Sequence, residues 1–440
     1  MDPLAYTNDI VNLSDVTLRP NPRRTIVRPF AAADPIEYAD PRRSRAQQIA
    51  ERVIGLSDME AQYMLALLLA AMRPRLRQPE SYLLDRFDEV NGTITVPRAI
   101  SEQRKQLIAA YFCSEYSFEA AALFNPSMIR QPETPVLPDG GVQFLVSLRA
   151  LGEGHVSSVT FRTGRWSAAT DFEIDDTASN EGVALRSVLG QETGDNEITH
   201  LVAPGGRPLS EMVVFPTTPS QRQGIEDMRL VIFEDDDLGP QVYGTYTAYD
   251  GRDARPEIMH RAASREIHFR RLKGRFATGK GMALFPRKID GKYLMLSRQD
   301  HQNVWLLRSD DLYQWDEGTK LLEPEGPWEF VQLGNCGSPI EIDEGWLVLT
   351  HAVGPVRLYT MGACLLAKRD PSKVLARMRY PLLRPSQVEG RDGYVPNVVY
   401  SCGGMVHDRT LLIPFGVADS ITRFASAPVE RVLAAMDWSQ

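Results

Sequence analysis

From residue 124 onward the chain breaks into short apolar or alternating runs separated by Gly, Pro and Asp. Such runs at regular spacing predict an all-β fold. Units of two strands and a polar turn recur near residues 142, 227, 283, 338 and 395. Five units favour a five-bladed β-propeller over a sandwich. We expect strands at 142–148, 156–161, 212–215, 293–296, 304–307 and 346–350.

The first 120 residues differ in character. Residues 1–40 are rich in Pro, Asp and Arg, which predicts an irregular arm with little core. Helices are expected between residues 40 and 112, one opened by a capping box of Ser57 and Glu60, and others over 80–90 and 101–112. We therefore divide the chain into an arm and helical segment, 1–120, packed on a propeller, 121–440. This segment could supply a dimer interface or a lid, so homo-oligomerisation stays open.

Charge and composition limit the partners. The formal net charge is −8, with Lys and Arg scattered among acids, so nucleic acid is not an expected partner. The four cysteines are widely spaced and without nearby histidines at ligand spacing, and no metal or other cofactor is expected. The longest apolar run, 64–72, is about half of a membrane span, and the N-terminus lacks an apolar segment. A cytoplasmic protein without a membrane partner is expected.

Residues 226–229, Glu-Asp-Met-Arg, are the strongest chemical signal. They precede a predicted hairpin with strands at 230–233 and 242–248. A carboxylate at a strand end beside an arginine suits general acid chemistry. The alternative is that Asp227 and Arg229 only tie down a loop, which is the commoner use of such a pair. Glu226 should point away from Asp227 because side chains alternate along a strand, and it is interpreted as structural.

A series of motifs from residue 122 to the C-terminus resembles glycoside hydrolase family 130, the β-mannoside phosphorylases and β-mannosidases. The resemblance implies a five-bladed propeller and cleavage with inversion. Each motif is short, but their common order along the chain makes the resemblance specific. The segments are 123–126 (LFNP), 147–150 (SLRA), 226–227 (ED), 246–249 (YTAY), 280–286 (KGMALFP), 309–315 (SDDLYQW), 345–347 (GWL) with His351, 370–373 (DPSK), 395–400 (VPNVVY) and 415–419 (FGVAD).

The resemblance carries specific roles onto this chain. Asp227 matches the catalytic aspartate that protonates the leaving oxygen through a sugar hydroxyl, although Met228 replaces the family's proline. The implied substrate contacts are Asn125, Arg149, Arg229, Tyr249 and Asp419. The implied phosphate or water pocket consists of Arg149, Lys280, His351 and Tyr359.

Two departures concern the nucleophile. Phosphorylases have Arg-Asn where this chain has Lys280 and Gly281, and Lys where it has Gln332. A phosphate dianion needs several charged donors, so the losses favour water as the nucleophile. We therefore interpret the chain as an inverting glycosidase that removes β-mannosides, especially β-1,2-linked ones, from the non-reducing end. The alternatives are a phosphorylase that uses inorganic phosphate to release mannose 1-phosphate, and a non-catalytic carbohydrate-binding propeller.

Hydrolysis requires a base, and no glutamate stands with certainty where the hydrolytic members have theirs. The nearest candidates are Glu153, Glu257 and Asp300, each more often structural than catalytic in such settings. His155 has the same two interpretations. Asp419 either holds sugar hydroxyls or caps a strand, and the resemblance favours the first.

Overall fold

The computed structural model describes residues 10–34, 43–132, 134–135, 137–176, 182–184, 186–187, 198–202, 209–263, 266–385 and 393–439. The chain divides into two compact units. The β unit comprises residues 1–21, 119–177 and 183–440, and the helical unit comprises 22–118 and 178–182. Each unit is described by itself.

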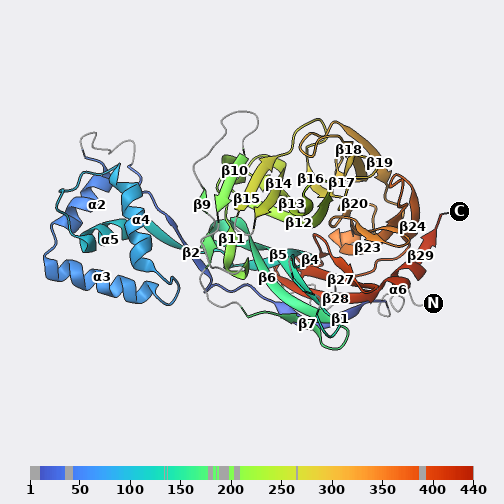
Figure 1. The fold of residues 1–440 in the computed structure, drawn as a ribbon, viewed down its shortest axis with the longest axis horizontal. Helices are drawn as coiled ribbons and strands as arrows, with labels where there is room; N and C mark the ends of the chain where they lie inside the picture. Colours follow the sequence, from blue (N-terminus) through green and yellow to red (C-terminus); the bar gives the residue numbers. More distant parts are fainter. Residues whose placement is uncertain are drawn as a thin grey trace. The chain divides into compact units, whose positions relative to one another are not determined.

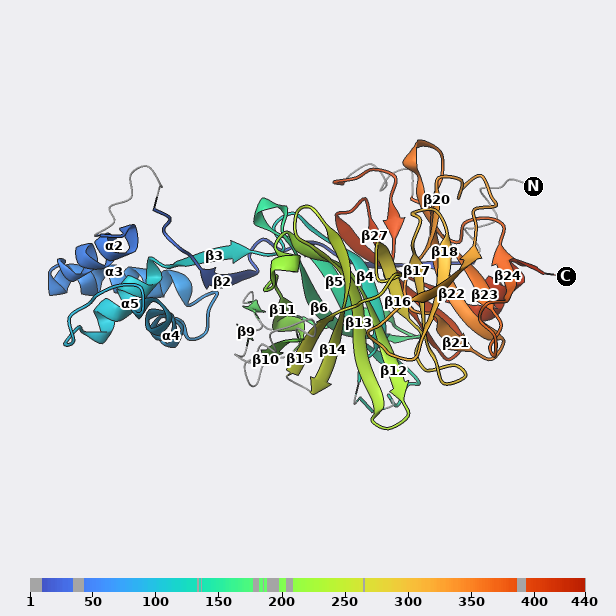
Figure 2. The same cartoon turned by 90° about the horizontal axis from the view of Figure 1, so that it is seen from above.

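The described part of the helical unit contains four helices and a two-stranded sheet (Figure 2). Ser44, Ser57 and Ser101 each accept a hydrogen bond from the backbone at the third helical position, and Ser57 and Glu60 form the expected capping box. These caps explain why the helices begin where the sequence predicts. The elements are β2 (Thr25–Pro29), α2 (Arg45–Ile54), α3 (Asp58–Met72), α4 (Pro79–Asn91), α5 (Glu102–Ala110) and β3 (Cys113–Ser117).

The helices share an apolar core that none of them could form alone. It includes Val53 from α2, Leu65 from α3, Leu83 and Phe87 from α4, and Ile108 from α5, all nearly inaccessible to solvent. That this unit packs on the β unit stays a prediction. Among the described residues, no single helix is long and apolar enough to cross a membrane, although the bent pair α2 and α3 passes the test of length and composition together.

The β unit consists of successive antiparallel strand groups (Figure 1). The first contains β4 (Ala122–Arg130), β5 (Val142–Leu151), β6 (Ser157–Ser167) and β7 (Asp171–Ile174), with β11 (Met212–Val214) on β6 and β8 (Val183–Ala184) on β11. The second contains β12 (Gly224–Asp235), β13 (Gly239–Tyr249), β14 (Ala254–Ala263) and β15 (Glu266–Arg271), extended by β10 (Ile198–Val202) and β9 (Arg186–Ser187). A parallel pairing of β6 with β12 joins these two groups.

Three further groups follow along the chain. The third is β16 (Lys280–Leu284), β17 (Tyr293–Arg298), β18 (Val304–Ser309) and β19 (Glu317–Leu322). The fourth is β20 (Gln332–Asn335), β21 (Ile340–Ile342), β22 (Gly345–Val353), β23 (Tyr359–Leu366), β24 (Val374–Met378) and β29 (Met436–Trp438). The fifth is β25 (Val399–Tyr400), β26 (Met405–His407), β27 (Thr410–Val417), β28 (Ile421–Pro428) and β1 (Asn12–Leu18), followed by α6 (Val429–Ala434).

Strand register brings one set of turns to a common edge. In the third group Lys280, the first residue of β16, pairs with Arg298, the last of β17. In the fourth, Gln332 at the start of β20 pairs with Val353 at the end of β22. The turns that follow β17 and β22 therefore lie at the edge where β16 and β20 begin. The turn after β27, which carries Asp419, has the same relation to β25.

The central strand β22 is buried on both faces of its sheet. All nine residues of β22 are buried, and its side chains enter two different apolar clusters, one shared with the third group and one with the fifth. Packing on both faces explains why this strand reads as a nearly continuous apolar run.

The expectation of an irregular arm is wrong for its described part. Residues 12–18 form β1, which completes the fifth group by pairing with β28, as Asn12 does with Ser426. Ile10 and Val11 are buried in the same apolar cluster as β27. The pairing partner lies about 400 residues away in the chain, so local composition carries no sign of it.

Candidate active site

Two irregular strand segments hold the first part of the site. Asp227 lies in a register shift of β12, between the pairs of Glu226 and Arg229, with a φ of 53°. Asn125 lies in a similar shift of β4, with a φ of 47°. A bulge re-aims side chains at the cost of regular pairing, and left-handed backbone at a residue other than glycine is concentrated at functional sites. The result is a hydrogen bond of 2.7 Å from Asn125 Nδ2 to Asp227 Oδ1.

Glu226 is part of this site, contrary to the expectation that it points away from Asp227. Arg149 donates to both carboxylates, over 2.8 Å to Glu226 and 3.2 Å to Asp227. Lys280 Nζ lies 2.6 Å from the other oxygen of Glu226. Strict alternation would have separated the two acids, but the irregularity in β12 starts directly after Glu226 and turns Asp227 toward the same arginine.

Arg229 lies beneath Asp227 and joins three strand groups. Its Nε donates to the carbonyl of Cys336 over 2.8 Å, and one terminal nitrogen donates to the Tyr400 hydroxyl over 2.9 Å. The other donates to the Asp227 carbonyl over 3.0 Å. Arg229 is 2% exposed. These contacts support a positioning role for Arg229, and direct contact with a sugar stays a prediction.

A second cluster, here called the donor cluster, consists of Arg298, Gln332 and His351. Arg298 Nη1 and Gln332 Nε2 lie 3.1 and 3.2 Å from His351 Nε2. The His351 ring meets the Tyr400 ring edge-on with centroids 4.8 Å apart. Lys280, paired with Arg298 across β16 and β17, links this cluster to Glu226.

His351 is neutral and acts as an acceptor. Burial lowers its pKa well below the usual value, and the positive charges of Arg298 and Arg229 lower it further. Because both Arg298 and Gln332 present donors to Nε2, that nitrogen accepts and the ring proton lies on Nδ1. Gly334 makes room for the ring, since a Cβ there would lie 2.4 Å from His351 Cε1.

Some buried polar atoms of the described residues in and beside the donor cluster have no partner of their own, among them the acceptors Asn125 Oδ1 and Asn335 Oδ1. Two donors share the single lone pair of His351 Nε2. Among the described residues, the buried Nε atoms of Arg298 and Arg149 have no hydrogen-bond acceptor. Buried donors are nearly always satisfied in folded proteins. An anion bound between Arg149, Lys280 and Arg298 would satisfy them.

Two carboxyl groups of the site have opposite pKa shifts. Burial raises the pKa of Asp227, but the charges of Arg149 and Arg229 and the hydrogen bond from Asn125 outweigh it, and the result is about 2. Burial, together with the negative charge of Asp227, raises the pKa of Asp419 to about 6. Environments that separate the pKa values of neighbouring acids are typical of catalytic sites.

We expect Asp419→Asn to stabilise the protein at neutral pH. The folded pKa of about 6 lies above the usual value of 3.8, so ionised Asp419 costs stability above pH 6, and the cost vanishes below pH 3.8. The variant should gain about 3 kcal/mol at pH 7.5 and nothing near pH 3.5. Urea unfolding across this pH range measures the gain. Asp408→Asn is the control, because Asp408 also has positive φ in a turn but is exposed. A gain that is independent of pH would contradict the prediction.

Comparison with known proteins identifies the family. Residues 207–438, more than half of the chain, match the family 130 glycoside hydrolase model described as β-1,4-mannooligosaccharide phosphorylase. The chain belongs to glycoside hydrolase family 130. This agrees with the resemblance of the sequence motifs.

Three similar proteins illustrate the relation to family 130. A 1,2-β-oligomannan phosphorylase of Thermoanaerobacter is 35% identical over 216 residues, covering 48% of this chain and 71% of the relative. A β-1,4-mannooligosaccharide phosphorylase of Ruminococcus albus is 35% identical over 163 residues, which cover 34% of this chain and 48% of the relative. The solved structure of a putative glycoside hydrolase from Bacteroides ovatus has a TM-score of 0.52 at 19% identity, covering 73% of this chain and 90% of its own.

Most of the residues that family 130 membership implied meet at this site. Asn125, Arg149 and Lys280 bond to Asp227 or Glu226, as described above. Asp419 has positive φ after β27 and is close enough to Asp227 for its pKa to shift. Tyr359 at the start of β23 packs against the small apolar cluster that contains Tyr400.

Tyr249 and the proposed bases do not join these contacts in the described structure. The Tyr249 hydroxyl donates to the Gly251 carbonyl over 3.0 Å. Glu257 accepts hydrogen bonds of 2.6 Å from both Ser220 and Tyr246 inside the second group. These contacts support a structural role for Glu257.

The other proposed bases lie in turns. Asp300 accepts from the side chains of Asn303 and Trp305, and the net effect of burial and these hydrogen bonds is a pKa of about 2. Glu153 lies in an exposed turn between β5 and β6 with His155, whose ring centroid is 5.9 Å from that of Tyr394. Their roles stay predictions.

Arg298 lies in none of the sequence motifs, and Glu226 lies in one of them but was interpreted as structural. Arg298 ends an apolar strand immediately before the polar residues 299–303. A charged side chain at the end of an apolar strand is the sequence signal that could have indicated Arg298 as a site residue.

Proposed function

We propose that this protein is an inverting β-mannoside phosphorylase, which transfers the terminal mannosyl group of a manno-oligosaccharide to inorganic phosphate. The observation that carries the proposal is the pair of buried guanidinium nitrogens without an acceptor, Nε of Arg149 and of Arg298, together with Lys280, which shares Glu226 with Arg149 and is the strand partner of Arg298. Water needs no such set, whereas a phosphate dianion is stabilised by several charge-assisted hydrogen bonds. The curated relatives, which are phosphorylases of β-mannosides, support the same function.

The comparisons favour this function over the hydrolytic one that the sequence suggested. Gly281 and Gln332 lack the donors that phosphorylases have at these positions, but Arg298 offers a guanidinium beside both. Gln332 and Arg298 both contact His351. Gly281 follows Lys280, which is the strand partner of Arg298. A phosphate pocket needs the donors rather than one particular residue to supply them.

We also propose that the five strand groups are the blades of a five-bladed propeller. Each group is an antiparallel meander, and the N-terminal β1 completes the last of them by pairing with β28. Contacts from β4, β12, β16, β20, β22 and β25 all reach the cluster around Asp227 and His351, which is expected where blades converge on an axis.

The proposed reaction exchanges one bond at the anomeric carbon. A phosphate oxygen attacks that carbon from the side of the donor cluster, the bond to the leaving sugar breaks, and the leaving oxygen gains a proton that Asp227 delivers. Inversion requires the acid and the nucleophile on opposite faces of the sugar. Asp227 is ionised in the ligand-free site because its pKa is about 2. A bound phosphate and the exclusion of water would both raise this pKa, so proton uptake is expected to accompany substrate binding.

Hydrolysis of β-mannosides is the second candidate, favoured by Gln332 and Gly281 where phosphorylases carry lysine and asparagine. It would need a base opposite Asp227. Glu226, the other carboxylate bonded to Arg149, adjoins Asp227 in the same strand and is paired with Lys280 as well. Its position supports a role in orienting these cations rather than in activating water.

Identification of the product tests the proposal. Purified protein is incubated with β-1,2- and β-1,4-linked manno-oligosaccharides, with and without about 10 mM phosphate, a concentration chosen for a site of millimolar affinity. We expect α-mannose 1-phosphate, formed only when phosphate is present. Free mannose released at the same rate without phosphate would establish the hydrolase instead. Substrate binding without any product would support the non-catalytic propeller.

A further inference from the structure

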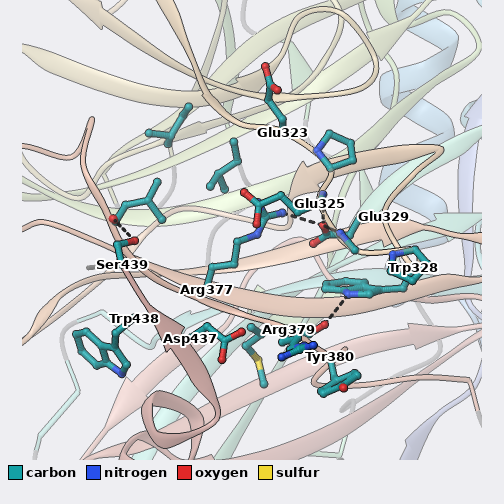
Figure 3. Close-up of a pocket in the computed structure, with 17 residues that line it drawn as sticks. Glu323, Glu325, Trp328, Glu329, Arg377, Arg379, Tyr380, Asp437, Trp438 and Ser439 are labelled. Atoms are coloured by element: carbon teal, nitrogen blue, oxygen red, sulfur yellow. Dashed lines mark hydrogen bonds and ion pairs between the residues drawn. The ribbon is translucent and has the colours of Figure 1, made fainter. Parts of the chain in front are cut away.

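A cavity lies away from the residue clusters around Asp227 and His351. It has a volume of about 890 Å³ and is here called the outer cleft. It is lined by residues from three segments: 321–329 after β19, 374–380 in and after β24, and 437–439 at the C-terminal end of β29 (Figure 3). No residue bonded to Asp227 or His351 is among them.

Aromatic side chains from all three segments border the outer cleft. Tyr380 is 40% and Trp438 53% exposed, so both present ring surface to solvent. Trp328 is held in place, because its indole nitrogen donates to the Arg379 carbonyl over 3.1 Å and its ring occupies the space that a side chain on Gly362 would fill. Flat apolar rings with polar edges suit ligands that have both an apolar face and hydrogen-bonding groups.

The polar groups of the outer cleft are preorganised. Arg377 forms ion pairs of 2.8 Å with both Glu325 and Glu329, and its side chain is only 14% exposed. Figure 3 shows this ion-paired group between Trp438 and Tyr380 on one side and Glu323 on the other. A network held by several contacts offers acceptors in fixed positions at little entropic cost.

The charge of the lining disfavours anionic ligands. Four acids, Glu323, Glu325, Glu329 and Asp437, face two arginines, Arg377 and Arg379, and Lys320 beside the cleft pairs with Glu323, which leaves an excess of one negative charge. A phosphate or nucleotide would be repelled, whereas carboxylates accept hydrogen bonds from neutral hydroxyl groups. Aromatic faces beside carboxylates therefore match a neutral saccharide, and the volume lies within the usual range for small-ligand sites.

One end of the outer cleft lies at the edge of the sheets where the candidate active site is built. Leu322, the last residue of β19, lines it and pairs with Val304, which directly follows the turn after β17. The segment 323–331 then leads from the cleft to Gln332 of the donor cluster. A long substrate that reaches the candidate active site would therefore approach the same edge.

We propose that the outer cleft is a second saccharide site, which binds part of a β-manno-oligosaccharide away from the bond that is cleaved. The proposal rests on the proposed function for the identity of the sugar. Trp438 and Tyr380 stack on pyranose rings, and Glu325 and Asp437 accept hydrogen bonds from sugar hydroxyls. The site increases affinity for long chains and leaves the reaction of a disaccharide unchanged.

Two variants, Trp438→Ala and Tyr380→Ala, test the cleft. Both residues are substantially exposed, so truncation should leave the fold intact. Calorimetric titration of manno-oligosaccharides from disaccharide to hexasaccharide is done with Asp227→Asn present in every protein to prevent turnover. We expect each aromatic variant to bind the hexasaccharide about fivefold more weakly and the disaccharide equally well. Trp438→Phe should retain most of the affinity. Tyr63→Ala, which removes an exposed ring from the helical unit, is the control.

Disaccharide turnover is measured separately, in proteins that retain Asp227. Equal hexasaccharide affinity in the parent and both aromatic variants, with disaccharide turnover by the parent, would overturn the second site alone. Absence of both turnover and binding in the parent would overturn the proposed function and this site with it. Equal losses for disaccharide and hexasaccharide would also contradict a separate site.

Discussion

Asp227→Asn should lower the turnover of manno-oligosaccharides by about 10²–10⁴-fold, the usual loss when a general acid is removed. Asparagine is nearly isosteric and tolerates positive φ, here 53°, so the backbone of β12 should not change. The variant keeps an oxygen that accepts from Asn125 but loses the charge that pairs with Arg149. Substrate affinity should therefore change much less than turnover.

Initial rates and calorimetric binding, measured on the same preparation, separate these effects. Asp316→Asn is the matched control, because Asp316 also has a hydrogen-bonded side chain and a lowered pKa but lies exposed after β18, bonded to Gln314 and the Arg275 backbone. It should retain full activity. An Asp227→Asn enzyme with more than half of the parent's rate on an unactivated substrate would remove Asp227 from the mechanism.

Local signals were enough for the helices of the helical unit and for several strands. Serine caps define where α3 and α5 begin, and both lie where the sequence predicted them. The runs at 142–148 and 346–350 fall within β5 and β22. Such elements depend on periodicity and capping, which a sequence displays directly.

Long-range pairing and broken register could not be predicted in the same way. The pairing of β1 with β28 joins the two ends of the chain. Glu226 was interpreted as structural because alternation along β12 was assumed, and the register shift at Asp227 removes that assumption. A bulge inserts a residue without altering composition, so a period-two pattern does not reveal it.

The residues of the candidate site also divide into those that a local sequence signal indicated and those that it did not. Asn125, Arg149 and Lys280 were found through motifs and do lie together, whereas Arg298 belongs to no motif that was considered. Its omission influenced the choice between water and phosphate. Without Arg298, the losses at Gln332 and Gly281 leave few donors for a dianion. Arg298 beside His351 adds a guanidinium to the proposed phosphate pocket.

Arg298→Gln should raise the KM for phosphate by about 10- to 150-fold, since each charge-assisted hydrogen bond lost is worth roughly 1.5–3 kcal/mol. Gln332 still donates to His351 Nε2 in this variant, which keeps the imidazole in place. The KM for the oligosaccharide should change little, because Arg149 and Asn125 contact Asp227 without Arg298. Rates measured over a matrix of phosphate and oligosaccharide concentrations separate the two constants.

Gln332→Lys should act in the opposite direction and lower the KM for phosphate, because it adds a positive charge within reach of His351 and Arg298. Arg308→Gln, the same change as Arg298→Gln but on the outward side of β18 near Asp370, is the control and should leave both constants unchanged. If Arg298→Gln lowered the rate equally at every phosphate concentration, Arg298 would support the fold of the site without binding the nucleophile. If the rates of the parent, Arg298→Gln and Gln332→Lys enzymes were all independent of phosphate, water would be the nucleophile. The buried donors of Arg149 and Arg298 would then have to be satisfied by the sugar.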